Sequence, residues 1–308
     1  MQIRQEHLNN AAELAREFQI AKPFRHLVLD NFLDEEFCKR LLNEFPGFDK
    51  KWALNESGLV GRKAAVPDIK AIGPAYREFD QLMQANDFLQ FVGKVAGMDS
   101  LLYDAQYVGG GTHENLDGQE LDLHVDFNFH PKRVWHRRLN LIVFLNPVWE
   151  PLWGGCLELH KDPWNPVADE CVTVVPELNR AVLFETTESS WHGFRKITLP
   201  GDRQDLSRRS LAVYFYTKSR PVEETAVPHA TVYVPLPLPK HLQAGYTLSQ
   251  EDADVLKELI DRRNGQIRFL YERELEFSEA IHALTGSLSF RAGRLLTWPA
   301  RWLRDQIR

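Results

Sequence analysis

The sequence has few cysteines, no long apolar run and no excess of positive charge, and each absence excludes a class of protein. Its three cysteines, Cys38, Cys156 and Cys171, are far apart and outside any CxxC spacing, so neither a disulfide framework nor a thiolate zinc site is encoded. The longest apolar stretch, 139–145, contains Asn140 and falls far short of a membrane span. These features favour a reducing compartment, and we expect a cytoplasmic protein.

The charge balance argues against nucleic-acid binding, because 37 lysines and arginines against 43 acidic residues give a net charge of -6. No chain-wide basic field exists to hold a polyanion. The sequence lacks a GxGxxG motif and a Walker loop, which argues against a dinucleotide-binding sheet and a P-loop. With 44% hydrophobic and 26% charged residues, 308 residues suffice for one large globular domain and an appendage.

The hydrophobic periodicity and the turn residues divide the chain into four predicted segments. Residues 1–22 read as a lead-in helix that Pro23 ends, and 23–218 as the main domain. The prolines within 219–248 indicate a linker, and 249–308 a helical tail with a basic amphipathic end. Within the main domain, helices are predicted at 34–45, with Asp34 as N-cap, and at 75–97, broken near Asn86.

The main domain is predicted to be mainly β. Eight short extended runs follow one another with no helix between them, separated by glycine, proline, aspartate and asparagine. They are 101–108, 121–124, 139–146, 156–160, 171–176, 180–185, 192–197 and 208–217. This succession favours two facing antiparallel sheets, a double-stranded β-helix or cupin-like jelly roll with flanking helices.

One short motif carries chemistry. In an extended strand, residues i and i+2 project to the same side, so His124 and Asp126 can present a nitrogen and a carboxylate oxygen to one metal. His192 opens another predicted strand that a jelly roll can bring alongside. Two histidines and a carboxylate on one face of an octahedron leave open positions, as in non-haem Fe(II) oxygenases. Downstream, Arg208 and Ser210 share a strand face, where a guanidinium beside a hydroxyl suits capture of a carboxylate.

The order of these motifs resembles a known family. His124-x-Asp126, then Gly154-Gly155-Cys156-Leu157-Glu158, then His192 and Arg208-x-Ser210 is similar to the 2-oxoglutarate/Fe(II)-dependent oxygenases of the prolyl-hydroxylase-like branch. The resemblance covers about residues 24–218, since the segment from His26 to Leu33 also resembles the start of that branch.

The resemblance implies residue roles and a reaction. His124, Asp126 and His192 would be the catalytic Fe(II) ligands, while Arg208 and Ser210 would bind 2-oxoglutarate. With O2, the cosubstrate would be converted to succinate and CO2 while an unactivated C–H bond is hydroxylated. Arg209 competes with Arg208, because neighbouring strand residues face opposite sides; the Arg-x-Ser pattern favours Arg208.

Other interpretations stay open. The same ligands could serve a cupin-like hydrolase or isomerase without a keto acid, or a structural metal in an adaptor that acts through its tail. The sequence does not identify the substrate, which could be a prolyl residue, a glycan-type compound or another small molecule. The basic run of Lys132, Arg133, Arg137 and Arg138 is interpreted as a solvated loop rather than a gate for an anion.

The tail also allows several partners. Its last twenty residues carry five arginines and one aspartate, which suits weak contact with an anionic membrane surface. Packing on the main domain or on a second subunit is the preferred alternative. Near-heptad spacing of apolar residues from Leu256 to Ile281 similarly favours packing or a homodimer.

Overall fold

The computed structural model describes residues 2–49, 51 and 64–297. By its internal contacts the chain divides into two compact units, 1–234 and 235–308. The first unit holds every strand of the described chain and all the candidate site residues.

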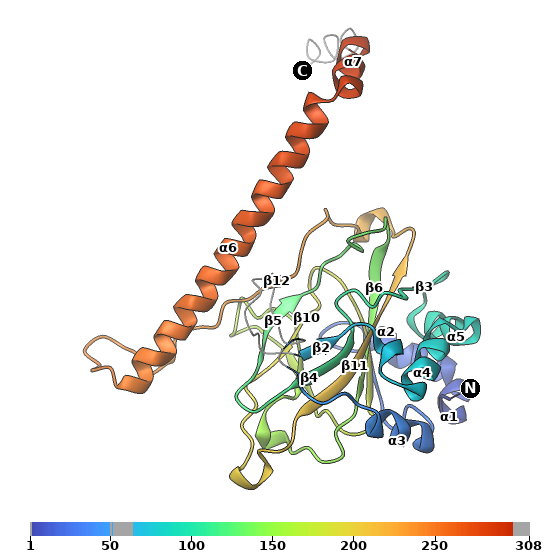
Figure 1. Ribbon diagram of the computed structural model, residues 1–308, viewed down its shortest axis with the longest axis vertical. Coiled ribbons are helices and arrows are strands. Elements are labelled where there is room, and N and C mark those ends of the chain that lie inside the picture. Colours follow the sequence, from blue (N-terminus) through green and yellow to red (C-terminus); the bar gives the residue numbers. More distant parts are fainter. Residues whose placement is uncertain (1, 50, 52–63, 298–308) are drawn as a thin grey trace. The chain divides into compact units, whose positions relative to one another are not determined.

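The larger of two antiparallel sheets contains seven strands within the described residues, in the order β1-β9-β6-β11-β4-β2, with β3 also paired to β11. Its members are β1 (His26–Leu29), β2 (Ala64–Val66), β3 (Leu102–Tyr103), β4 (Gly111–Asn115), β6 (His136–Phe144), β9 (Ala181–Glu185) and β11 (Arg208–Thr217). The long central pair, β6 and β11, runs through the middle of this sheet (Figure 1).

The smaller sheet has the order β12-β5-β10-β7-β8. Its strands are β5 (Leu121–Val125), β7 (Leu157–His160), β8 (Cys171–Val174), β10 (Trp191–Phe194) and β12 (Val232–Tyr233). The two sheets face each other, because Phe144 and Phe184 of the larger sheet pack with Leu157 and Leu159 of the smaller. The predicted fold class, a mainly β jelly roll with flanking helices and a C-terminal helical tail, is confirmed.

Helices cover the outer face of the larger sheet (Figure 1). They are α1 (Gln5–Asn9), α2 (Ala11–Ile20), α3 (Glu35–Asn43), α4 (Pro74–Gln84) and α5 (Asn86–Ala96). Short 3-10 turns lie at Ile69–Ala71, Pro151–Trp153, Gly201–Arg203 and Val222–Glu224. The break predicted near Asn86 separates α4 from α5, and Gly97 ends α5 in the left-handed conformation that favours glycine, at φ 69°.

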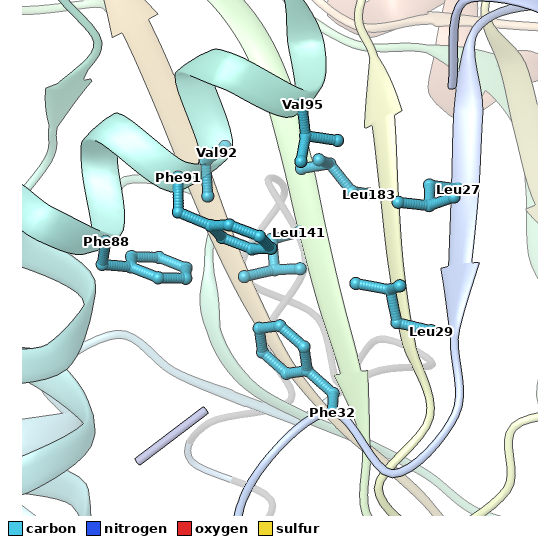
Figure 2. Close-up of a pocket in the computed structure, with 9 residues that line it drawn as sticks. All are labelled: Leu27, Leu29, Phe32, Phe88, Phe91, Val92, Val95, Leu141 and Leu183. Carbon is cyan, nitrogen blue, oxygen red and sulfur yellow. The ribbon is translucent and has the colours of Figure 1, made fainter. Parts of the chain in front are cut away.

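The contact between α5 and the larger sheet is closely packed. Figure 2 shows Phe88, Phe91, Val92 and Val95 of α5 pointing at Leu141 and Leu183 of the sheet. The gap left among these side chains is about 10 Å³ and has an entirely apolar lining. A space of that size holds at most one water molecule, so this region is core and not a ligand site.

The strand predictions were right for most of the sheet and wrong at its polar or short members. The run 101–108 forms only the two-residue β3, and β4, which begins at Gly111, was not predicted. β4 reads Gly-Thr-His-Glu-Asn, a composition with low strand propensity, and it is held instead by pairing with β11 and β2. The segment 219–248 contributes β12, which pairs with β5.

The second unit contains α6 (Gln250–Gly286) and α7 (Leu288–Leu296). Ser249 and Asp252 form the predicted capping box at the start of α6. Searched through the described residues, neither these helices nor any other is at once long enough and apolar enough to cross a bilayer. The predicted basic end, from residue 298, lies outside the described residues.

Asp34 provides a direct test of how α3 begins. Its carboxylate accepts hydrogen bonds from the backbone N–H groups of Glu36 and Phe37, at 3.1 and 3.3 Å. We expect Asp34→Ala to lower the free energy of unfolding by about 1 kcal/mol, because two helix N–H groups lose their acceptor. Urea denaturation followed by tryptophan fluorescence measures this loss. Asp34→Asn keeps an oxygen acceptor and should lose far less; equal losses would show that the cap is unimportant.

Candidate active site

The two predicted histidines lie opposite each other on neighbouring strands. β5 and β10 of the smaller sheet pair antiparallel, and the register sets His124 against His192. Asp126 follows directly after β5. Its Oδ1 lies 3.8 Å from Nε2 of His124, and its Oδ2 lies 3.5 Å from Nε2 of His192. The fold therefore brings all three side chains together, with one ligand atom of each within 4.8 Å of the others.

Hydrogen bonds to the backbone orient both imidazoles. Nδ1 of His124 lies 2.8 Å from the carbonyl oxygen of Asp122, and Nδ1 of His192 lies 2.9 Å from that of Ser190. A carbonyl only accepts, so each Nδ1 carries the proton and donates it. The lone pair of each ring is then on Nε2, which faces Asp126 in both cases. This second contact is what fixes the tautomer and orientation of metal-ligating histidines.

The strands approach closely because a glycine follows His192. A Cβ built on Gly193 would lie 2.6 Å from the carbonyl oxygen of Leu121 and 3.0 Å from that of Asp122, both on β5. Any other residue would push β10 away from β5. Gly193 therefore permits the strand spacing on which the two histidines depend.

Asp126 is held by two side chains of β6. The amide of Asn140 donates to its Oδ2 at 2.8 Å, and Nη2 of Arg137 lies 3.0 Å from the same oxygen. Burial opposes ionisation of Asp126, but the positive charge of Arg137 and the hydrogen bond from Asn140 favour the carboxylate, and the pKa of this carboxyl lies below its usual range. The site thus keeps Asp126 as a carboxylate, the form that binds a metal.

Arg137 corrects the interpretation of the basic run as a solvated loop. Its side chain is fully buried, with the guanidinium 3.5 Å from the ring centroid of Tyr214 and 4.5 Å from that of Phe127. Its Nε donates to Asn140 at 3.0 Å. Arg138 is buried too, since β6 already begins at His136, so only Lys132 and Arg133 of the run are exposed. The physical reason is that β6 draws these residues into the sheet.

Arg208 lies at the start of β11 with its side chain between the sheets. Its guanidinium lies 4.2 Å from the ring centroid of Phe194 and 5.0 Å from that of Phe144, and its Nε donates to the carbonyl of Gly155 at 2.5 Å. Burial lowers the pKa of Arg208 to about 9, and within the described residues no carboxylate forms an ion pair with this guanidinium. A buried guanidinium without an anionic partner is costly, which suits a site that receives a carboxylate.

Arg208 and the histidines meet along β10. Phe194, on which Arg208 stacks, stands two residues after His192 on the same strand face. Two residues of strand span about 7 Å. Arg208 would therefore be available to hold one carboxylate of a dicarboxylate cosubstrate.

The structure also places the remaining predicted residues. Ser210 is buried on the same face of β11 as Arg208, opposite Phe144 of β6. Arg209 faces the helices instead, where its Nε lies 3.3 Å from Glu114 and 2.9 Å from the hydroxyl of Ser207. Of the two arginines, only Arg208 has its guanidinium inside the jelly roll.

The donor set fits Fe(II). Two imidazole nitrogens and one carboxylate oxygen converge from one strand pair, which is the ligand set of non-haem Fe(II) oxygenases. His124, Asp126 and His192 could hold the metal without rearrangement of the backbone. Arg208, buried and without a carboxylate partner among the described residues, could hold the distal carboxylate of 2-oxoglutarate.

Comparisons with known proteins agree with this chemistry. Residues 110–216 match the family model of the 2OG-Fe(II) oxygenase superfamily, a segment that contains all five predicted site residues. The chain is 23% identical over 266 residues to mouse prolyl 3-hydroxylase OGFOD1, covering 83% of this chain. It spans only 42% of that relative.

Solved prolyl hydroxylases are similar as well. A Trichoplax adhaerens prolyl hydroxylase, in complex with a peptide of hypoxia inducible factor, aligns with 13% identity and a TM-score of 0.48, covering 70% of this chain and 94% of that one. A Pseudomonas putida prolyl-4-hydroxylase aligns with 16% identity and a TM-score of 0.43. This alignment covers 66% of this chain and 98% of that one.

The match to the family model confirms the resemblance seen in the sequence. Residues 110–216 match the 2OG-Fe(II) oxygenase superfamily, and the predicted cofactors, Fe(II), 2-oxoglutarate and O2, agree with that match and with the convergence of His124, Asp126 and His192. The match covers about a third of the chain.

The sequence interpretation missed three residues that shape the site. Arg137 was assigned to a loop, and Phe194 was not singled out. Asn140 was noted only as an interruption of an apolar run. An asparagine in the middle of a buried strand needs a hydrogen-bond partner, so the sequence could have indicated a polar contact at this position.

Arg137 allows a test of how Asp126 is positioned. We expect Arg137→Met to weaken Fe(II) binding about 10-fold to 100-fold, because the carboxylate loses the charge that holds its orientation. Anaerobic competition against a chromophoric chelator measures the affinity, and near-ultraviolet circular dichroism checks the fold. Arg133→Met, in the same basic run but exposed, is the matched control. If Arg137→Met unfolds the chain, Asn140→Ala tests the same support; unchanged affinity in the folded variant would refute it.

Proposed function

We propose that the whole chain is an Fe(II)- and 2-oxoglutarate-dependent dioxygenase that hydroxylates an unactivated C–H bond. The observation that carries this proposal is the pairing of two features inside one jelly roll. Three ligand atoms converge at His124, Asp126 and His192, and the buried Arg208 near them lacks a carboxylate among the described residues. A hydrolase or isomerase would use the first feature and leave the second unexplained.

Each predicted residue has a proposed role. His124, Asp126 and His192 are the metal ligands, and Arg208, assisted by the hydroxyl of Ser210, binds the distal carboxylate of 2-oxoglutarate. The position of Arg209 on the helix-covered face supports Arg208 in this choice. Asn140 and Arg137 keep Asp126 oriented toward the two Nε2 atoms.

The reaction follows from these roles. Bound Fe(II) supplies activation of O2, so that R–H, O2 and 2-oxoglutarate give R–OH, succinate and CO2. The chain supplies the environment for that chemistry. The guanidinium of Arg208 neutralises the cosubstrate's negative charge, and the apolar rings of Phe144, Phe184 and Phe194 exclude water around it.

For the substrate we propose a prolyl residue in a peptide or protein. Support comes from the mouse relative, whose name is prolyl 3-hydroxylase, and whose similarity extends over most of this chain. A glycan-type or other small molecule is the alternative, since an iron site of this kind does not itself select the substrate.

The remaining organisation is also a proposal. Residues 1–22 act as a lead-in segment, 23–218 as the oxygenase domain, 219–248 as a linker and 249–308 as a tail for packing, homodimerisation or weak membrane-surface contact. Apolar side chains such as Ile267, Leu270 and Ile281 are more than half exposed within the second unit, which supports a partner for α6. Three free cysteines support a reducing, cytoplasmic location.

Anaerobic titration of the metal-free protein tests the cofactor site. Fe(II) and 2-oxoglutarate together should give the visible charge-transfer absorption of the chelate in wild type and none in His124→Ala. Arg208→Ala should need about 10-fold to 150-fold more 2-oxoglutarate, because a charged hydrogen-bonded pair is lost. Arg209→Ala is the matched control and should titrate like wild type. An iron-loaded, folded wild type without the band would contradict the proposal.

The substrate class needs its own experiment. We expect proline-containing peptides, supplied with Fe(II), 2-oxoglutarate and O2, to gain one oxygen atom by mass spectrometry, with succinate formed in equal amount. His192→Ala should form neither product, because one of the proposed ligands is gone. Hydroxylation of an oligosaccharide pool but of no peptide would replace the prolyl substrate while leaving the oxygenase proposal standing.

A further inference from the structure

A second group of metal-ligating side chains lies on the outer face of the smaller sheet. Leu157 and Leu159 of β7 point into the core between the sheets, so the alternate residues Glu158 and His160 point outward. β8 pairs with β7 in a register that sets Cys171 opposite His160. The three side chains therefore share one face, with one ligand atom of each within 4.8 Å of the others.

The distances match those within a metal coordination shell. Nε2 of His160 lies 3.2 Å from Oε2 of Glu158 and 3.4 Å from Sγ of Cys171. Bond lengths to zinc place two ligand atoms of a tetrahedral site about 3.3–3.6 Å apart. A small shift of these side chains would thus admit an ion among the nitrogen, oxygen and sulfur atoms.

An aspartate fixes the histidine from behind. Nδ1 of His160 is hydrogen-bonded to Oδ2 of Asp169. The other oxygen, Oδ1, accepts from the backbone N–H groups of Lys161 and Asp162 at 3.0 and 2.9 Å, which anchors this carboxylate. Nε2 of His160 is thereby directed at Glu158 and Cys171. A carboxylate on the far nitrogen of a ligating histidine is a common support in zinc sites.

Burial leaves the group open on one side. The side chains of Glu158, His160 and Asp169 are 11%, 7% and 12% exposed, whereas Cys171 is exposed. Nε of Arg195 lies 2.8 Å from Oε1 of Glu158, but this arginine side chain is 78% exposed and leaves Oε2 to the group. The hydroxyl of Thr173 lies 3.9 Å from Sγ of Cys171. An ion could enter from the Cys171 side.

We propose that Glu158, His160 and Cys171 form a second metal site, selective for Zn²⁺ and separate from the candidate iron site on the inner face. Thiolate, imidazole and carboxylate are the three zinc ligand types, and the thiolate disfavours hard cations such as Mg²⁺ and Ca²⁺. Three protein ligands leave a fourth position for water. The ion joins β7 to β8 at the edge of the sheet, and Asp169 acts as the positioning residue for His160.

Cobalt provides the first test, because it reports sulfur ligation by absorption. Metal-free full-length protein titrated with Co(II) should develop a thiolate-to-cobalt absorption in the near ultraviolet. The candidate iron site contains no cysteine, so it contributes none of this signal. Cys171→Ala should abolish the absorption, while the matched variant Cys38→Ala, at a buried core cysteine, should retain it. Asp169→Asn should weaken binding about 10-fold to 100-fold.

Alkylation of Cys171 provides the second test, using zinc itself. Cys38 and Cys156 are buried, so iodoacetamide should label Cys171 first. We expect Zn²⁺ to slow this labelling in wild type and in His192→Ala, but not in His160→Gln. Absence of the cobalt absorption, or labelling that Zn²⁺ does not slow, would overturn the proposal and leave a metal-free ion pair of His160 with two carboxylates.

Discussion

The pairing of β5 with β10 is the constraint on which the candidate active site depends. It sets His124 against His192 in register, and Asp126 follows at the end of β5. Local sequence can make only the His-x-Asp half of this site. The other half comes from a strand far along the chain, whose place is fixed by the jelly-roll topology. Metal-binding chemistry here is therefore a property of the whole sheet, and it forms only when the domain folds.

Two arginines, Arg137 and Arg208, are buried between the sheets, and they differ in whether a carboxylate offsets the charge. Arg137 is buried against Asp126, so its cost is offset by an ion pair and by two aromatic rings. Arg208 contacts the rings of Phe144 and Phe194 and donates to a backbone carbonyl, but within the described residues it has no carboxylate partner. A buried guanidinium without a counter-charge is destabilising. The carboxylate of 2-oxoglutarate that we propose for this position would offset the cost.

The fold class and the grouping of His124, Asp126 and His192 could be predicted from the sequence, because they are marked by a short motif and by period-two strands. Prediction failed where tertiary contacts override local preference. β4 has a strand-poor composition and forms through its neighbours. Arg137 looks like part of a basic loop until β6 pairs with β11. The group of Glu158, His160 and Cys171 escaped a search for CxxC spacing, because its ligands come from two strands and only one is a cysteine.

Gly193 has a consequence for how this protein could lose function. A side chain at this position would meet the carbonyl oxygens of β5, and the strands would have to separate. Both histidines and the aspartate would still be present in such a chain, and every motif that identifies the family would remain intact. Inspection of the ligands alone would classify the variant as competent. Inactive paralogues of this kind can therefore arise through the backbone, with no ligand lost.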